Sequence, residues 1–157
     1  MGAKAPIAVV AHNIRSLWNI GALFRTCDAL GIDHLYLTGY SAVPPRKEIS
    51  KTALGAEAWV PWTYEKDPLA VLERLRSEGY VIAGLEIAEG STSLYDYTPK
   101  GPQCLVLGHE ILGVPKELQD RCDVIVHIPM HGRKESLNVA VAAGIALFSL
   151  RKPAGSS

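Results

Sequence analysis

Short apolar segments alternate along the chain with stretches in which apolar residues recur every three or four positions. The apolar segments are typical of buried strands, and the periodic stretches are typical of helices that bury one face. This alternation predicts an α/β domain with a mostly parallel sheet and helices on both faces of the sheet. The expected strands are residues 7–11, 34–38, 59–62, 80–85, 104–107 and 124–128, and the expected helices are residues 18–30, 47–57, 68–77 and one that begins near Ser136.

Residues at the ends of these elements refine the prediction. Gly31 follows the first helix, where a left-handed residue is favoured. Pro61 places the short strand 59–62 at an edge or an end of the sheet. The strand 104–107 is apolar throughout, which suits a central parallel strand covered on both faces. The last helix is apolar almost all round, so we expect it to be buried, in part against another subunit.

The composition fits one compact domain over residues 1–157, with a core over residues 7–150 and a loose tail over residues 152–157. The chain has 157 residues, of which 48% are hydrophobic and 20% are charged, enough apolar material for a core without disulfides. We find no signal peptide and no apolar stretch long enough to span a membrane. The three cysteines are odd in number and lack CxxC spacing, so we expect free buried thiols in a cytoplasmic protein.

The charge balance argues mildly against a nucleic-acid partner. The chain has 16 basic and 16 acidic residues, which gives a formal net charge of zero. Proteins that bind nucleic acids usually carry an excess of positive charge. Binding to RNA would therefore require a local basic surface.

The first candidate segment leaves the first strand and enters the first helix, where parallel α/β sheets bind their ligands. Gly21 and Arg25 lie four residues apart on one helix face, so the missing side chain of Gly21 leaves room for a ligand beneath Arg25. The start of the helix also favours a phosphate. On spacing alone, however, a simpler interpretation is favoured, in which Asn19 caps the helix, Gly21 allows close packing and Arg25 is a solvated charge.

The second candidate segment is a glycine-rich turn after the strand 104–107. It has the sequence Gly-His-Glu-Ile-Leu-Gly over residues 108–113 and carries the carboxylate of Glu110. Its position at the end of a strand suits a binding loop, although it lacks the GK[ST] ending of a phosphate loop and the pattern GxGxxG. Taken alone, an ordinary turn with Glu110 in solvent is the simpler interpretation.

The third candidate segment links the strand 124–128 to the last helix. Ser136 is the expected cap of that helix, which is the simplest interpretation of this segment. Asn138 then lies in the first turn of a buried helix, where its amide needs a partner, either structural or a ligand. Three nearby apolar side chains, Ile128, Met130 and Leu137, could form a slot for an adenine.

Other chemistries find little support in the sequence. No cysteine and histidine cluster has the spacing of a zinc site, so we expect no metal. The GxSxG motif of an α/β-hydrolase is absent. His127 lies in an apolar strand and is expected to be a hydrogen-bonded histidine of the core.

Taken together, the three segments resemble the SpoU (TrmH-like) branch of the SPOUT methyltransferases. The similarity keeps the order of the family's motifs and covers residues 7–150. Each motif is weak alone, but three in the correct order and spacing are specific. They correspond here to Asn19-x-Gly21-x-x-x-Arg25, to Gly108-x-Glu110-x-x-Gly113, and to Ile128-Pro129-Met130 with Ser136-Leu137-Asn138-Val139-Ala140.

The resemblance implies features of the fold that the pattern of residues does not. It implies a deep trefoil knot formed between about residues 104 and 149. It also implies that S-adenosylmethionine binds in this knot and that two copies form an obligate homodimer with the active site at their interface. The residues implied to hold the cofactor are Leu85, Gly108, Glu110, Ile128, Met130, Ser136 and Leu137.

The activity implied by the resemblance is methylation of a ribose 2′-hydroxyl in tRNA or rRNA. In the family, the arginine that matches Arg25 is thought to contact an RNA phosphate and to assist loss of the hydroxyl proton, since arginine alone is no base. Asn19, Glu110, Ser136 and Asn138 match polar residues that orient the ribose and Arg25. Most of the rate would come from alignment of the reacting atoms, without a metal. Candidate RNA contacts are Arg15, Arg25, Arg46, Lys47, Lys51, Arg133 and Lys134.

Three alternatives stay open at this point. The chain could be a family member that binds RNA or cofactor without turnover, or it could methylate a base instead of a ribose. It could also be an unrelated α/β protein that binds a nucleotide. The sequence does not identify the RNA or the nucleotide that is modified.

Overall fold

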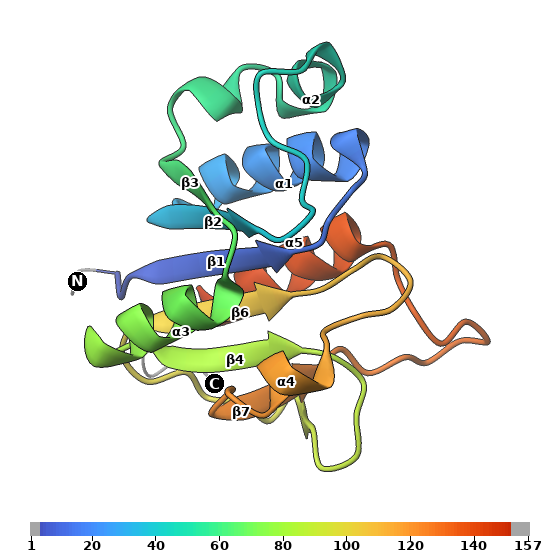
Figure 1. The fold of residues 1–157 in the computed structure, drawn as a ribbon. Coiled ribbons are helices and arrows are strands. Elements are labelled where there is room, and N and C mark those ends of the chain that lie inside the picture. The colour runs from blue at the N-terminus through green and yellow to red at the C-terminus, as the bar shows by residue number, and fades with distance from the viewer. Residues whose placement is uncertain (1–3, 152–157) are drawn as a thin grey trace.

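The computed structural model describes residues 4–151, and the tail predicted over residues 152–157 lies outside them. These residues form a seven-stranded sheet in which every pairing is parallel, in the order β3-β2-β1-β6-β4-β7-β5 (Figure 1). The predicted α/β class with a parallel sheet is therefore confirmed. The strands are β1 (Ile7–His12), β2 (His34–Thr38), β3 (Trp62–Glu65), β4 (Val81–Leu85), β5 (Thr92–Ser93), β6 (Gln103–Leu107) and β7 (Val124–His127).

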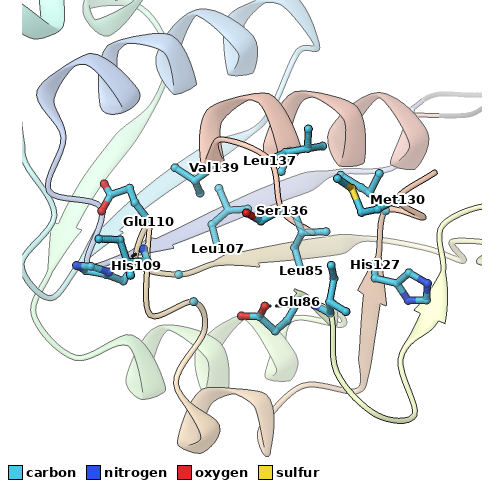
Figure 2. A pocket seen from close by; sticks show the side chains of 16 residues that line it. Leu85, Glu86, Leu107, His109, Glu110, His127, Met130, Ser136, Leu137 and Val139 are labelled. Carbon is cyan, nitrogen blue, oxygen red and sulfur yellow. Dashed lines mark hydrogen bonds between the residues drawn. The ribbon is translucent and has the colours of Figure 1, made fainter. Parts of the chain in front are cut away.

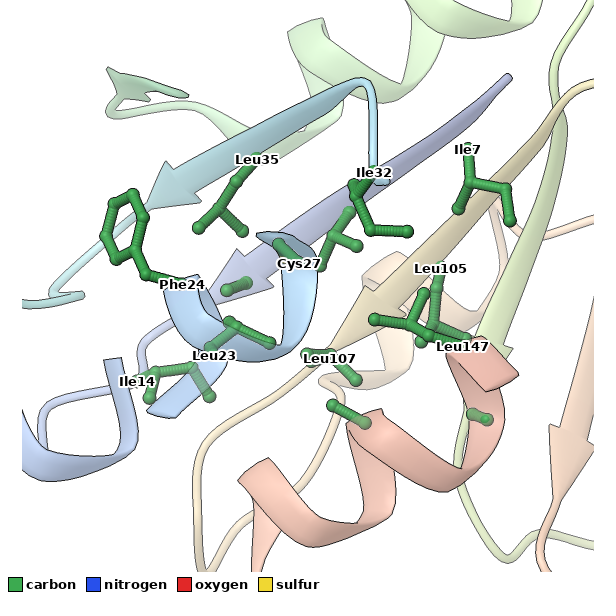
Figure 3. Packing of buried hydrophobic residues seen from close by; sticks show 14 of the residues in the cluster. Ile7, Ile14, Leu23, Phe24, Cys27, Ile32, Leu35, Leu105, Leu107 and Leu147 are labelled. Carbon is green, nitrogen blue, oxygen red and sulfur yellow. The ribbon is translucent and has the colours of Figure 1, made fainter. Parts of the chain in front are cut away.

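Helices cover both faces of this sheet, as the sequence predicts. Helices α1 (Leu17–Ala29) and α5 (Val139–Leu150) contribute to one core with one face of the central strands, and Figure 3 shows this packing. Helices α3 (Pro68–Ser77) and α4 (Lys116–Gln119) contribute to a second core on the opposite face. Helix α2 (Lys47–Ala53) packs on α1 and is followed by a short 3-10 helix, η1 (Ala56–Ala58). Among these described helices, none is long and apolar enough to cross a membrane.

Several predicted boundaries shift by a few residues for local reasons. The helix expected over residues 47–57 is divided into α2 and η1 because Leu54 takes a left-handed conformation, with φ of 53°. The strand expected over residues 59–62 begins only at Trp62, because Trp59 ends η1. Its predicted place at the edge of the sheet is confirmed. Strand β5 and helix α4 are too short to give a periodic pattern and were not expected.

Both predicted helix caps are wrong. Helix α1 begins at Leu17, and the hydroxyl of Ser16, rather than Asn19, accepts the free backbone N–H at its start. Helix α5 begins at Val139, and Asn138, rather than Ser136, caps it. In each segment two side chains are able to cap the helix, Ser16 and Asn19 in the first case and Ser136 and Asn138 in the second. Sequence alone does not decide between the two.

Helix α5 is buried on one face only within this chain. Ala143, Ala146 and Leu147 are fully buried against the sheet and α1. Three apolar side chains on the outward face are exposed, namely Val141, Ile145 and Phe148. Within a single chain the helix is therefore buried on one face, and burial of its outer face against another subunit stays a prediction.

Gly21 lies where α1 and α2 approach most closely. A Cβ atom at this position would stand 1.8 Å from the Thr52 hydroxyl oxygen and 2.4 Å from the Ile49 carbonyl oxygen. The space beside Gly21 is therefore filled by α2. The prediction that it leaves room for a ligand beneath Arg25 is wrong, and close packing is the reason for the glycine.

Replacement of Gly21 tests this packing. We expect Gly21→Ala to destabilise the protein by about 1–3 kcal/mol, because the added methyl group overpacks the α1–α2 contact. The free energy of unfolding in urea measures the effect. Gly144→Ala is the matched control, since its Cβ would meet only the Thr26 methyl at 3.7 Å and a helical glycine costs about 0.5–1 kcal/mol relative to alanine. Equal stability of Gly21→Ala and the unmodified protein would contradict the close contact.

Candidate active site at the carboxyl edge of the sheet

A pocket opens at the carboxyl edge of the sheet, between the ends of β4, β6 and β7 and the start of α5 (Figure 2). Its lining comes from three segments that are far apart in the sequence. The structure brings together here all seven residues that the sequence suggested for a cofactor, Leu85, Gly108, Glu110, Ile128, Met130, Ser136 and Leu137.

The walls of this pocket combine apolar and polar side chains. Leu85 and Leu107 stand at the ends of two neighbouring strands, and the expected apolar slot of Ile128, Met130 and Leu137 joins them. Polar groups gather at the same rim, including two carboxylates and two imidazoles. This composition suits a flat apolar ring that is oriented by a few polar contacts. The polar lining side chains are Glu86, His109, Glu110, His127 and Ser136.

The glycine-rich turn of residues 108–113 is held in a tight conformation. A Cβ atom at Gly108 would stand 2.3 Å from the carbonyl carbon and oxygen of Gly113, whose own φ is +73°. The backbone N–H of Gly113 donates to the His109 carbonyl at 2.9 Å, and the His109 Nδ1 accepts from Ile111 and Leu112 N–H groups at 3.0 Å. Both glycines are therefore required by the backbone, and main-chain groups of the turn are fixed at the pocket.

Glu86 is a pocket residue that the sequence reasoning missed. Its carboxylate accepts the backbone N–H of Val114 at 2.8 Å, which closes the far end of the glycine-rich turn. It also accepts the N–H of Ile87 at 3.2 Å. The available signal was its position as the first residue after an apolar strand.

Glu110 joins this turn to the first candidate segment. Its carboxylate accepts the backbone N–H of Ser16 at 3.1 Å, across 94 residues of sequence. The same Ser16 caps α1 through its hydroxyl. The expectation that Glu110 stands free in solvent therefore does not hold, and the carboxylate fixes one segment against the other.

Asn138 joins the third segment to the first. Its amide nitrogen donates to the side-chain oxygen of Asn19 at 3.2 Å. Its amide oxygen accepts from the backbone N–H groups of Ala140 and Val141 at 2.9 and 3.3 Å. The predicted need of this amide for partners is met within the protein. Ser136 does not cap the helix. It lines the pocket and is exposed.

Arg25 stands apart from this constellation within one chain. It is exposed on α1, almost two turns beyond Asn19, and does not line the pocket. Within residues 4–151, no hydrogen bond or ion pair involves its guanidinium. The structure therefore brings Asn19, Glu110, Ser136 and Asn138 toward one place, but not Arg25.

The suggested RNA contacts are exposed but differ in their surroundings. Arg15, Lys51 and Arg133 have exposed side chains, as have Lys47 and Lys134. Arg46 is exposed too, but its guanidinium forms an ion pair with Glu48 at 3.2 Å. Arg46 is therefore partly neutralised.

The histidine and cysteine predictions are only partly confirmed. His127 is half-buried at the pocket, with its Nδ1 2.7 Å from the Ser91 hydroxyl, rather than inside the core. All three cysteines are free, and Cys122 is only half-buried. Burial raises the pKa of Cys27 to about 12 and that of Cys122 to about 11, so these thiols are protonated at neutral pH and poor nucleophiles. No cluster of metal-binding side chains occurs within the part of the chain that the structure covers.

Comparison with known proteins identifies relatives along nearly the whole chain. The model of the SpoU rRNA Methylase family matches residues 6–148. The chain is 32% identical to a tRNA (guanosine(18)-2'-O)-methyltransferase of Aquifex aeolicus, over 93% of this chain and 69% of that protein. The curated relatives that it matches are longer, and it spans between 57% and 69% of their lengths.

Solved structures resemble this fold closely. An AdoMet-bound rRNA methyltransferase from Sinorhizobium meliloti superposes with a TM-score of 0.89 at 28% identity, over 98% of this chain and 59% of that one. A structure described under 2-OH methylation of C/U34 on tRNA superposes with a TM-score of 0.81 at 26% identity. The latter match covers 93% of this chain and 94% of the other, so the two have nearly the same extent.

Proposed function

The chain belongs to the SpoU rRNA methylase family, and we propose that it is an RNA ribose 2′-O-methyltransferase that uses S-adenosylmethionine. The observation that carries this proposal is the pocket at the carboxyl edge of the sheet, where residues of the second and third motifs converge. The Aquifex relative is named for a ribose 2′-O-methylation of tRNA, and the Sinorhizobium structure is an rRNA enzyme with AdoMet bound. We therefore propose tRNA or rRNA as the substrate.

The pocket residues fit the proposed cofactor. The apolar slot of Ile128, Met130 and Leu137 suits the two faces of an adenine, and Leu85 extends it. The turn that begins at Gly108 lines the same pocket in a tight, hydrogen-bonded conformation, so it would form a rigid wall beside the base. When bound there, S-adenosylmethionine supplies a methyl group on a sulfonium.

The polar residues would position the ribose and assist loss of its proton. The Asn19–Asn138 hydrogen bond and the Glu110–Ser16 hydrogen bond hold the first motif against the pocket. Ser136 is left free to contact the ribose or cofactor at the rim. Arg25 would bind the phosphate beside the target nucleotide, and its positive charge would favour transfer of the hydroxyl proton to solvent water as the 2′-oxygen is methylated. Alignment of the oxygen with the methyl group would then provide most of the rate.

We also propose that the protein is a homodimer and that the dimer completes the site. The outward face of α5 exposes Val141, Ile145 and Phe148, which recur four and three residues apart and form one apolar stripe. An apolar stripe that is exposed in a single chain is typical of a helix face that packs against a partner in the assembly. Arg25 lies outside the pocket of its own chain, and we propose that in this dimer it serves the pocket of the partner.

We further propose that residues 1–157 are one domain with a knot near its carboxyl end. Residues that follow β5 and residues that follow β7 both pack into the core formed with α1 and α5, at Leu94 and Ile128 respectively. The first connection leads from the outer strand β5 across to β6, and the second leads from β7 back to α5. A trefoil knot requires in addition that the second connection passes through the loop formed by the first, and this threading is what we propose. Free thiols also suit a cytoplasmic location, which cell fractionation would test.

A nucleoside assay tests the proposed activity. We expect the protein, incubated with S-adenosylmethionine and unmodified tRNA and rRNA, to yield nucleosides with an added methyl group on the ribose. Mass spectrometry after enzymatic digestion measures the product. A methyl group on a base would overturn the ribose assignment, and cofactor binding without any methylated nucleoside would indicate a binding protein.

Replacement of Arg25 tests its role in the same assay. We expect Arg25→Ala to reduce turnover on the order of 10²- to 10⁴-fold, because it removes the group that assists proton transfer. Calorimetry should give an unchanged affinity for S-adenosylmethionine, since Arg25 does not line the pocket. Lys100→Ala, also an exposed cation, is the control and should keep full activity. Full activity of Arg25→Ala would refute the assignment.

Sedimentation tests the proposed dimer. We expect twice the chain mass of 17.0 kDa at micromolar concentration, and the monomer mass for Ile145→Asp, which places a charge in the apolar stripe. Leu54→Asp is the control, because Leu54 is exposed directly after α2 and its left-handed conformation tolerates aspartate. A monomeric unmodified protein would rule out the dimer.

Mechanical unfolding tests the proposed knot. When the two ends of a knotted chain are pulled apart, the knot tightens and retains residues, so the unfolded length falls short of the full contour. An unknotted chain of 157 residues reaches about 3.6 Å per residue. Optical tweezers measure this length, and an extension to the full contour would exclude a knot.

A further inference from the structure

A second hollow lies at the same edge of the sheet, at the ends of β1, β2 and β3. The mechanism above does not use it, apart from the suggestion that Arg15 contacts RNA. It is formed by the loops that follow β1 and β2, together with β3. Its lining residues are Arg15, Gly39, Tyr40, Ser41, Val43 and Tyr64.

This hollow combines aromatic faces with a positive charge. Tyr40 is 80% exposed and Tyr64 is 43% exposed, although tyrosine usually buries much of its ring. Arg15 is exposed, and no carboxylate within residues 4–151 pairs with it. Two accessible aromatic rings beside an unpaired guanidinium are the groups that proteins use to hold a base and its phosphate.

The backbone beneath Tyr40 is fixed in an unusual conformation. Asn13 has a φ of +60°, and its side-chain oxygen accepts the backbone N–H of Tyr40 at 2.7 Å. Gly39 has a φ of +64°, and a Cβ atom there would stand 2.1 Å from the Asn13 side-chain oxygen. The Tyr64 hydroxyl donates to the Gly39 carbonyl at 2.8 Å. These contacts fix the backbone of Tyr40 and the hydroxyl of Tyr64, which limits the conformations that the hollow can take before it binds a ligand.

Ser41 ties the two loops of the hollow together. Its hydroxyl donates to the Ala11 carbonyl at 2.8 Å and accepts the N–H of Ile14 at 2.9 Å. The N–H of Ala42 in turn donates to the Ile14 carbonyl at 2.9 Å. The loop that carries Tyr40 therefore cannot move independently of the loop that carries Arg15.

The hollow is linked to the candidate active site by one hydrogen bond. Arg15 lines the hollow, and the next residue, Ser16, donates its backbone N–H to Glu110, which lines the pocket. The two sites therefore lie side by side at the edge of the sheet, linked through Ser16 and Glu110. A strand of RNA whose target ribose enters the pocket would extend its neighbouring nucleotide toward the hollow.

We propose that the hollow binds one unpaired nucleotide next to the methylated one, with its base stacked on Tyr40 and Tyr64 and its phosphate paired with Arg15. This inference rests on the proposed RNA methyltransferase function. It favours RNA that is single-stranded at the modified position, because only unstacked bases can pack on protein rings. Stacking also supplies affinity without an excess of basic residues, which accounts for RNA binding by a chain of zero net charge.

A binding assay with a fluorescein-labelled decamer of uridine tests the stacking. We expect Tyr40→Ala to weaken binding about tenfold, because loss of one base–aromatic stack is of this size. Tyr40→Phe keeps the ring and should bind within about twofold of the unmodified protein. Fluorescence anisotropy measures the dissociation constants. Trp59→Ala is the matched control, since Trp59 is also exposed but bonds to Asp28 in the last turn of α1, away from the hollow.

The salt dependence of binding distinguishes the two kinds of contact. Removal of a phosphate contact lowers the slope of log affinity against log salt concentration by about 0.7 for single strands. We expect this change for Arg15→Ala and no change of slope for Tyr40→Ala. A decamer that carries 4-thiouridine should also cross-link to residues 26–46, the tryptic peptide that contains Tyr40.

The outcomes separate this inference from the proposed function. Equal binding by Tyr40→Ala and the unmodified protein, with methyl transfer intact, would overturn the stacking site and leave the function standing. Failure of the unmodified protein to bind RNA or to methylate it would overturn both. Binding of S-adenosylhomocysteine by Tyr40→Ala, measured by calorimetry, should be unchanged, because the hollow and the pocket have separate linings.

Discussion

The parallel alignment of every strand is the constraint on which the site depends. Because all described strands run the same way, the loops that follow β1, β2, β4, β6 and β7 emerge at one edge of the sheet. Segments separated by as many as 119 residues meet there, as the hydrogen bond between Asn19 and Asn138 demonstrates. The pocket and the aromatic hollow are two parts of this single edge, and the Glu110–Ser16 hydrogen bond joins them. An antiparallel sheet would have distributed the same loops between two edges.

The polar residues of the motifs support the fold as well as the candidate chemistry. Ser16 and Asn138 each cap a helix, which is worth about 1 kcal/mol for a typical cap. The two caps also connect to the other motifs through Glu110 and Asn19. Capping and catalysis are therefore not competing explanations for these segments. A cap that fixes the start of a helix also fixes the side chains that surround the pocket.

The sequence predicted what local patterns determine and missed what distant contacts determine. Strand β6 was found as residues 104–107 because an apolar run of this kind needs no knowledge of its neighbours. For Gly21 the sequence offered two interpretations, room for a ligand or close packing. Its neighbour is α2, some thirty residues later, so only the packed structure, with the contact at Thr52, decides for close packing. The family resemblance predicted the seven residues expected to hold the cofactor, and all of them line the pocket. Glu86 also lines the pocket, but it belongs to none of the quoted motifs and was missed. The separation of Arg25 from the pocket also depends on three-dimensional placement.

A formal net charge of zero is compatible with RNA binding, because several acidic side chains are engaged by other groups of the protein, whereas the basic side chain of Arg15 is not. The carboxylates of Asp33, Glu86 and Glu110 each accept a backbone N–H group of the protein itself. Others form ion pairs, such as Glu65 at the end of β3 with Arg74 on α3. Arg15, in contrast, has no acidic partner within residues 4–151 and stands at the edge where the pocket opens. The field that an RNA meets is set by this local arrangement rather than by the sum of charges.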